Sequence, residues 1–491
     1  MTSQFADALP ELCAPAQAQP APAPRLLHLT TSLAQELGLD PQWLTTDDGV
    51  RLLTGKAPGP GAHPVAQGYA GHQFGSYSPV LGDGRALLLG ELTDPAGRLR
   101  DLHLKGSGRT PFSRPGSDGL AAVGPMLREL VVSEAMHALG IPTTRVLAVV
   151  ATGRTVHRER PLPGAVLARV AGSHLRVGTA QYAAALVQAG RAPEDLVPRL
   201  VAAAVRRHHP ERADAEVPAL ALLEAVVAAQ ADLVARWMLV GFVHGVMNTD
   251  NMTLSGEGID YGPCAFLDAF DPSAVFSSID RQGRYAYGNQ PQIALWNLNR
   301  FAEALLPHLA PSPTSSPDAA VDAATTALEG FAPAFDAAWQ RGLAAKLGVP
   351  RTEASDDVAA RLLGLLAEHR VDWTSFWAEL AGVVPGPNPT PGVLAGLPDG
   401  EATRAWRADW LALRPDPALM ARTNPLLVPR NRPLQDALDA AEAGDLAPVE
   451  AVLAAVRAPF SRQAAAASPE ARSLAAPGPE GTTPFVTFCG T

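Results

Sequence analysis

Oxygen-bearing side chains gather in the segment 244–266 of this chain. Asp250 and Asn251 stand side by side, and Asp260 follows nine residues later, at the head of a D-Y-G triplet. Carboxylate and amide oxygens are ligands that Mg²⁺ prefers, and Mg²⁺ commonly binds together with the phosphates of a nucleotide. A polar surface loop without a ligand is the alternative interpretation. We predict that Asn251 and Asp260 are metal ligands.

The same segment has the spacing of a protein-kinase catalytic loop, H-R-D-x-x-x-x-N, followed by D-F-G. His244 takes the histidine position, Asn251 the metal-binding asparagine and Asp260 the metal-binding aspartate. Val246 stands where a kinase has its catalytic aspartate, and valine cannot accept a proton. Asp250 is the nearest carboxylate to the metal ligands, so it is the natural replacement for the missing base.

Candidate phosphate-binding residues come earlier in the chain. Gly82 and Gly84 flank a tight turn that opens onto an expected strand. Glycines let backbone N–H groups approach an anion closely, and Arg85 adds a fork of donors. A hairpin turn without a ligand fits this short pattern equally well.

Lys105 ends the next expected strand and precedes a helix that carries two glutamates. This order matches the kinase lysine and its helical glutamate partner. Glu134 falls within the apolar stripe of the helix, where a buried carboxylate needs a cation. Glu129 lies off the stripe and nearer the start of the helix, and periodicity does not choose between the two.

Three further charged positions complete the candidate site. Asp118 is followed by Gly119 in a glycine-rich loop. Arg169 lies within an apolar run and Arg176 is flanked by apolar residues, so both are expected to point into a cleft. A structural salt bridge is the alternative for each arginine.

Composition excludes several other classes of protein. The chain has 491 residues with a net charge of −10, which opposes binding to nucleic acid or to an anionic membrane. Residues 1–24 lack the basic and apolar regions of a signal peptide, and the apolar run 233–247 is too short to span a bilayer. Three cysteines, Cys13, Cys264 and Cys489, form neither a disulfide scaffold nor a zinc site. A cytoplasmic monomer is expected.

The elements that must position these residues follow from periodicity and turn formers. In chain order they are strands over 85–92 and 98–105 joined by a turn at 94–97, a helix over 124–139, strands over 145–150 and 165–170, and helices from about 180 onward. Residues 14–24 are Ala/Pro-rich, and 464–491 are predicted to be a mobile tail. This order predicts an α+β fold of the bilobal protein-kinase type, with a small β-rich lobe and a large helical lobe that carries helical extensions.

Composition breaks place the expected domain boundaries. Pro/Gly-rich stretches at 311–317 and 384–399 interrupt the helical part. The expected units are an N-terminal extension over 1–66, an N-lobe over 67–178, a C-lobe over 179–310, a helical extension over 311–463 and a tail over 464–491.

Four blocks of sequence together resemble the selenoprotein O family, kinase-fold proteins that act as protein adenylyltransferases. The blocks read GYAGHQFGSYSPVLGDGRA, LHLKGSGRTPFSRPGSDG, SEAMHALGIPTT, and HGVMNTDNM with DYGPCAF. The resemblance runs from about 68 to 272, and the C-terminal third matches only loosely. Strings of this length are highly specific.

The resemblance implies transfer of AMP from ATP to Ser, Thr or Tyr hydroxyls of protein substrates, with the nucleotide flipped relative to a kinase. It implies Mg²⁺ as the metal, for which Mn²⁺ could substitute. It also implies Asp250 as proton acceptor, Asn251 and Asp260 as metal ligands, and Glu129 as the partner of Lys105. The implied ATP contacts are Gly82, Gly84, Arg85, Lys105, Asp118, Gly119, Arg169, Arg176 and Asp260.

The family has a redox-active residue near its C-terminus, so the resemblance further implies a reversible disulfide between Cys264 and Cys489. Two unrelated thiols are the alternative. Two rival functions remain at this point: a kinase that transfers the γ-phosphate, and an inactive pseudokinase that binds ATP as a regulatory scaffold.

Overall fold

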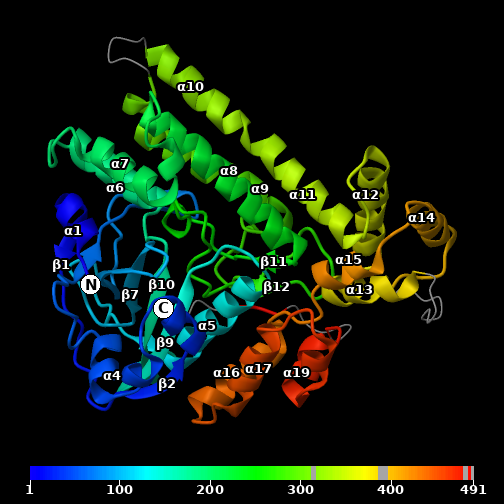
Figure 1. Cartoon of the computed structure of the whole chain (residues 1–491), viewed down its shortest axis with the longest axis horizontal. Helices are drawn as coiled ribbons and strands as arrows, with labels where there is room; N and C mark the ends of the chain where they lie inside the picture. The colour runs from blue at the N-terminus through cyan, green and yellow to red at the C-terminus, as the bar shows by residue number, and fades with distance from the viewer. Residues whose placement is uncertain (311–316, 385–395, 479–484, 488–491) are drawn as a thin grey trace.

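The computed structural model describes residues 1–310, 317–384, 396–478 and 485–487. It has a mixed α+β architecture, in which an N-terminal antiparallel sheet is followed by a largely helical region (Figure 1). The sheet occupies one side of the molecule, and the long helices α8, α10 and α11 extend along the other.

The strands are β1 (Cys13–Pro15), β2 (Arg25–Leu29), β3 (Val65–Gln67), β4 (Gly71–Gln73), β5 (Ser76–Ser78), β6 (Ala86–Thr93), β7 (Leu99–Lys105), β8 (Ala121–Ala122), β9 (Arg145–His157), β10 (Pro161–Ala171), β11 (Phe242–Val243) and β12 (Ala265–Phe266). The main sheet has the order β1-β3-β6-β7-β10-β9-β2, and β8 pairs with β10. β4 with β5, and β11 with β12, form separate two-stranded pairs.

The helices before the last strand pair are α1 (Gln4–Ala8), α2 (Thr31–Glu36), α3 (Pro41–Leu44), α4 (Asp47–Leu53), α5 (Val123–Ala138), α6 (Val177–Gln188), α7 (Leu196–His208) and α8 (Pro218–Leu239). Those that follow are α9 (Gln290–Leu305), α10 (Pro317–Glu329), α11 (Phe331–Lys346), α12 (Glu353–Glu368), α13 (Trp373–Leu380), α14 (Glu401–Ala412), α15 (Pro417–Thr423), α16 (Asn431–Glu442), α17 (Ala447–Val456), α18 (Arg462–Ala466) and α19 (Pro469–Ala475). A short 3₁₀ turn, η3, spans Thr249–Asn251.

Helices cover both faces of the sheet. Alternate residues of β7 point to opposite faces and therefore contact different helices. Leu102 and Leu104 pack into the apolar cluster formed with α2 and α4. Successive strand residues point to opposite faces, so His103 and Lys105 face the other side, where α5 lies. The period-2 pattern read from the sequence therefore placed Lys105 on the correct face.

The strands and the helix expected around the candidate site agree with β6, β7 and α5 to within two residues. β9 and β10 are longer than the expected 145–150 and 165–170, with 13 and 11 residues. Beyond Ala151 the residues of β9 are mostly not buried, so no apolar run marked this part of the strand. The two strands pair with each other there, outside the core.

Residues before position 66 contribute to the same sheet as those after it. β1 pairs with β3 at one edge, and β2 pairs with β9 at the other. The boundary expected at 66 therefore falls within one sheet.

The first part of the expected mobile tail is helical: α18 ends within it and α19 follows. Ser461 and Ser468 accept backbone N–H groups at the starts of these helices, which is a capping pattern that the sequence contains. Ala471 and Leu474 of α19 are buried. Most of the Pro/Gly-rich breaks at 311–317 and 384–399 lies outside the described residues.

The helix α8 is long and apolar enough to cross a membrane by length and composition alone. Two thirds of its most apolar window is buried inside the protein, where it packs against α7, α9 and α11. An apolar helix buried in this way is typical of the core of a helical domain.

Lys346, at the end of α11, is a buried cation held by aromatic rings. Its Nζ lies 4.7 Å from the ring centroid of Trp377 and 5.8 Å from that of Trp373. No carboxylate pairs with it among the described residues. Burial lowers the pKa of Lys346 to about 7.

We expect Lys346→Met to stabilise the fold by on the order of 1 kcal/mol or more at pH 6, because it removes a buried charge without a counter-ion. The folded pKa lies below the unfolded one, so unfolding takes up a proton and stability rises with pH above 7. The advantage of the variant should therefore shrink between pH 7 and pH 10. Urea unfolding across this range measures it, with Arg341→Met, an exposed cation of α11, as the control. A variant less stable than the parent at pH 6 would contradict this expectation.

Candidate active site

A cleft of about 720 Å³ lies between the sheet and the loop that follows α8, within the range of small-molecule sites. The predicted residues that line it are Gly82, Gly84, Arg85, Lys105, Asp118, Glu129, Arg169, Arg176, Asp250, Asn251 and Asp260. Gly119 and Cys264 do not line the cleft.

Three buried cations converge on one carboxylate at the centre of the cleft. Lys105 Nζ lies 2.6 Å from Asp260 Oδ1, Arg169 donates to the same oxygen at 2.8 Å, and Arg176 lies 3.4 Å from Oδ2. Lys105 also pairs with Glu129, to which Arg169 approaches within 3.9 Å. Burial opposes ionisation of Asp260, but attraction from Lys105, Arg169 and Arg176 outweighs it and holds its pKa well below the ordinary value. Three cations against two carboxylates leave positive charge for an anionic ligand.

The other candidate glutamate lies elsewhere. Glu134 accepts from Arg145 at 2.6 Å and lies 2.9 Å from Arg457. It therefore ties α5 to β9 and to the chain just after α17, while Glu129 is the residue that contacts Lys105.

Asp250 is a buried carboxyl beside this cluster. Its Oδ1 has no hydrogen-bond partner in the described structure, and its backbone carbonyl accepts from Arg176 at 2.9 Å. Burial raises the pKa of Asp250 to about 6, although Arg176 acts in the opposite direction. A Cβ added at Gly71 would lie 2.5 Å from Asp250 Oδ1, so only glycine leaves room for this carboxyl.

Backbone contacts hold the neighbouring residues in place. Asn251 Nδ2 donates to the carbonyl of Val246 at 2.9 Å, which leaves its Oδ1 free to bind a cation. His244 lies 2.9 Å from the carbonyl of Ile259, the residue before Asp260. Burial lowers the pKa of His244, so a neutral ring donates there. Asp260 itself has a φ of 62°, an uncommon conformation for a residue other than glycine.

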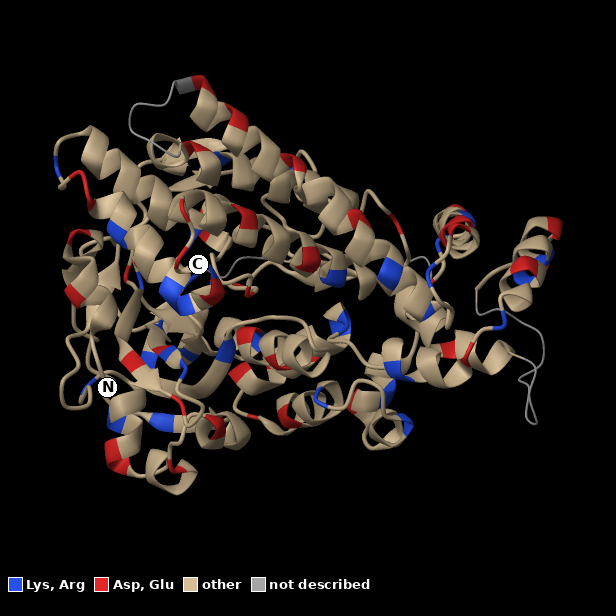
Figure 2. Ribbon diagram, turned by 45° about the horizontal axis from the view of Figure 1, so that its top comes forward, with Lys and Arg blue, Asp and Glu red and all other residues tan. Residues whose placement is uncertain are grey.

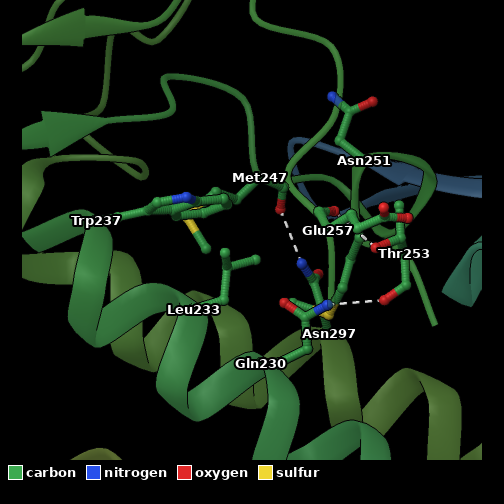
Figure 3. Close-up of a pocket in the computed structure, with 9 residues that line it drawn as sticks. Gln230, Leu233, Trp237, Met247, Asn251, Thr253, Glu257 and Asn297 are labelled. Carbon is green, nitrogen blue, oxygen red and sulfur yellow. Dashed lines mark hydrogen bonds between the residues drawn. The ribbon is translucent and has the colours of Figure 1, made fainter. Parts of the chain in front are cut away.

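The loop that carries these residues is closed by the β11–β12 pair and supported from behind by two helices (Figure 3). Gln230 of α8 donates to the carbonyl of Thr253 at 2.7 Å, and Asn297 of α9 donates to that of Met247 at 3.0 Å. The cavity between loop and helices is only about 10 Å³, too small for a substrate. This side of the loop is therefore support, and the chemistry belongs to the larger cleft.

The glycine turn is anchored by a buried network that the sequence did not suggest. Asp83, between Gly82 and Gly84, lies 2.9 Å from His103 Nε2, and the His103 ring stacks on His174 at 4.2 Å. His174 in turn lies 2.9 Å from Asp101. The network joins the turn before β6 to the loop that leads to Arg176. The polar alternation of Asp101, His103 and Lys105 along β7 was the available signal.

Gly82 packs against an aromatic ring. Its φ is 68°, and an added Cβ would overlap Phe112. Glycine is therefore required here by conformation and by contact, and Phe112 itself lines the cleft.

The carboxylate of Asp118 is engaged by Arg158 in the turn between β9 and β10. Arg158 Nη1 and Nη2 lie 2.8 and 3.1 Å from its two oxygens. Hydrogen bonding from Arg158 lowers the pKa of Asp118. Gly119 packs against the backbone of Gly108. Arg158, which also lines the cleft, was missed because a charged hairpin turn normally indicates a solvated surface.

Of the predicted cysteine pair, only Cys264 can be placed, because Cys489 lies outside the described residues. Cys264 is buried, and its thiol donates to the carbonyl of Tyr261 at 3.1 Å. Burial raises its pKa to about 11. Thr487 donates its hydroxyl to the carbonyl of Pro263 at 2.6 Å, so the segment 485–487 contacts the residue before Cys264.

The donor set fits a magnesium ion that binds together with a nucleotide. Asn251 Oδ1 and the Asp260 carboxylate are oxygen donors on the cleft, and no group of three or more His, Cys, Asp or Glu side chains in the described chain could hold a metal by itself. Mg²⁺ usually takes one or two protein oxygens and completes its shell with phosphates and water.

Comparison with known proteins gives matches along nearly the whole chain. A family model described as "Protein adenylyltransferase SelO" matches residues 1–456. A "Protein nucleotidyltransferase YdiU" of Mycolicibacterium smegmatis is 58% identical over 493 residues, covering 100% of this chain and 98% of the relative. Proteins of the same name from Pseudarthrobacter chlorophenolicus and Cereibacter sphaeroides are 56% and 54% identical, covering 99% and 96% of this chain and 97% and 96% of the relatives.

We expect the Asp250 carboxyl to titrate with a midpoint near pH 6 in the free protein, since burial disfavours its charged form. Carbon NMR of carboxyl-labelled aspartate measures the midpoint, and Asp250→Asn identifies the resonance. Arg176→Gln should raise the midpoint further, because Arg176 favours the ionised form. A midpoint close to the ordinary ~3.9 would show that water reaches this carboxyl.

Proposed function

Since this chain belongs to the SelO family of protein adenylyltransferases, we propose that it transfers AMP from ATP to Ser, Thr or Tyr hydroxyls of protein substrates. The observation that carries the proposal is the juxtaposition of a cation-rich cleft with a buried carboxyl that has an unpartnered oxygen. The first can bind the phosphates of ATP, and the second can accept a proton from an incoming hydroxyl. We place this reaction in the cytoplasm.

A kinase-like bilobal arrangement is part of the proposal. The sheet with α5 serves as the N-lobe over 67–178, joined by strands from 1–66, and the helices from 179 to 310 serve as the C-lobe. The contact of Lys105 with Glu129 across β7 and α5 supports this assignment, because kinases use the same strand-to-helix pair. The helices over 311–463 are an extension of the C-lobe.

ATP lies in the cleft with its phosphates toward the buried cations. Lys105, Arg169 and Arg176 bind the terminal phosphates, which requires the nucleotide to be flipped relative to a kinase. A cation–π contact with Tyr69 orients Arg176, whose guanidinium carbon lies 4.4 Å from the ring centroid. The remaining nucleotide contacts are assigned to Gly82, Gly84, Arg85, Asp118 and Gly119.

Asn251 and Asp260 are the residues that would hold magnesium. The ion, when bound, neutralises charge on the phosphates and on the departing pyrophosphate. Asp260, which would hold the ion, also contacts Lys105, Arg169 and Arg176, so one carboxylate orients all three cations in the cleft.

Asp250 acts as the base. It accepts the proton of the acceptor hydroxyl while the hydroxyl oxygen attacks the α-phosphorus. The bond from that phosphorus to the bridging oxygen of pyrophosphate breaks, and AMP remains on the acceptor. Val246 in the standard base position is consistent with a reaction centre displaced from that of a kinase.

Incubation with ATP labelled at the α-phosphate or at the γ-phosphate tests the reaction. With magnesium, reductant and a generic protein acceptor, we expect label to be retained from the α position only. Asp250→Asn should lower transfer by about 10²–10⁴-fold, the usual contribution of a general base. Arg341→Met, an exposed substitution, is the control.

Label retained from the γ position only would mean a kinase. Retention of neither label, with ATP still bound, would favour a non-catalytic scaffold. Either outcome would overturn the proposed transfer.

We further propose that Cys264 and Cys489 form a reversible disulfide that restrains the active loop. The support is the docking of the segment 485–487: Thr487 donates to Phe276 and to Pro263 at 2.8 and 2.6 Å. Because burial raises its pKa, Cys264 is a poor nucleophile toward a free oxidant. In the proposal Cys489 therefore attacks the oxidant's disulfide first and releases one thiolate, and Cys264 then attacks the mixed disulfide within the same chain and releases the second thiolate.

Oxidised glutathione, which supplies the oxidant, should lower AMP transfer several-fold, and dithiothreitol should restore it. Cys489→Ser and Cys264→Ala should both remove this response, while Cys13→Ser retains it. Mass spectrometry of the unreduced protein identifies the linked peptides. Equal activity of the oxidised and reduced forms would refute redox control.

A further inference from the structure

We propose that an apolar patch at the mouth of the cleft docks the acceptor protein through a segment that carries apolar and acidic residues beside the acceptor hydroxyl. This mouth patch consists of Tyr77, Val80, Ile279 and Val486. The inference rests on the proposed function and names the class of acceptor segment that the site takes.

The mouth patch contains most of the large apolar side chains that the described surface exposes. Its four residues are 46%, 49%, 53% and 44% exposed, and the others of this kind are Trp43 and Val321. Single exposed apolar residues are ordinary, but several of them on neighbouring segments that border a functional cleft indicate a binding surface.

Two segments far apart in sequence meet at this mouth. Phe74, in the turn between β4 and β5, packs on Tyr285 with ring centroids 5.1 Å apart. The backbone N–H of Phe74 and the hydroxyl of Tyr285 both donate to Asn248 Oδ1, at 3.1 and 2.6 Å. Asn248 lies two residues before Asp250. An acceptor seated here therefore lies beside the proposed base.

The segment 485–487 adds the fourth residue. Ser278 donates to the carbonyl of Thr487 at 3.0 Å, and Thr487 donates to Phe276 at 2.8 Å. This pairing brings Val486 next to the loop that carries Ile279, which itself lines the cleft.

The charges around the mouth patch are positive. Arg281 is exposed on the loop of Ile279, Arg284 approaches Gly75 of the hairpin turn, and Arg114 donates to Gln73 at 2.9 Å. None of the three arginines forms an ion pair within the described part of the chain. Asp280 is buried and accepts backbone N–H groups of this loop.

Arg284 also lies over the ring of Trp296, at 4.8 Å from its centroid. Cations that lack a carboxylate partner around an apolar surface favour a partner segment that carries carboxylates. By contrast, acidic residues recur along α10 (Figure 2). Val321, on α10, is about as exposed as Val80, but its neighbours along the helix include Asp318 and Asp322.

The test uses the full chain, α-labelled ATP and two synthetic peptides that contain one serine, one threonine and one tyrosine. One peptide carries leucines and glutamates around each hydroxyl, and the other carries glycines and lysines there. We expect the first to be modified with a higher kcat/KM. Val80→Ser and Ile279→Ser should each lower that value by about tenfold, through KM, since each removes apolar contact with the acceptor.

Val321→Ser is the matched control and should leave kcat/KM unchanged. Calorimetry should give the parent's Kd for ATP in Val80→Ser and Val321→Ser, whose side chains do not line the cleft, and thermal unfolding of all three variants should be unaltered because these side chains are exposed. Preference for the lysine peptide, or Val80→Ser and Ile279→Ser behaving like Val321→Ser, would overturn the docking surface. A parent chain that transfers no AMP to any acceptor would overturn the proposed function, and the docking surface with it.

Discussion

The structure depends on a buried cluster around Asp260 in which the cations outnumber the carboxylates. Three cations taken out of water are costly, and two carboxylates do not fully compensate them. Such an arrangement contributes little to stability by itself. Its value is that an anionic ligand entering the cleft meets donors that are already oriented and desolvated, so little reorganisation is needed.

The surrounding structure holds these charged side chains in fixed positions. β7 and β10 are neighbours in a sheet covered on both faces, so Lys105 and Arg169 project from rigid backbone. Arg176 is fixed by a carbonyl and an aromatic ring, and the loop of Asp260 is held by side chains of α8 and α9. The stacked pair His103 and His174 links the glycine turn to the Arg176 loop through two buried aspartates.

The sequence predicted the structure best where a residue periodicity or the spacing of a motif was the signal. The alternation of apolar and polar residues along β7 predicted that Lys105 faces away from the leucines, and Lys105 faces α5. The kinase-like spacing predicted that Asn251 and Asp260 share a site, and both line one cleft. The sequence did not choose between Glu129 and Glu134, because both lie on buried parts of α5 and only the register of α5 against β7 decides which one meets Lys105. Arg158 and the Asp83–His103 contact depend on pairing between distant strands, which no local pattern encodes. The helices α18 and α19 follow serine caps, but their alanine-rich segments resemble an unstructured tail in composition.

The position of Asp250 explains why a valine can occupy the standard base position. Val246 lines the cleft, and its carbonyl orients Asn251. Asp250 lies on η3, where Gly71 leaves room for its carboxyl and the hairpin of β4 and β5 passes beside it. The proposed base is thereby placed at the side of the cleft that faces the hairpin, two residues after Asn248. If Asp250 accepts the proton, as proposed, the acceptor hydroxyl must reach this side of the cleft, where the hairpin contacts η3. The proposed reaction and the proposed acceptor surface therefore depend on the placement of one carboxyl.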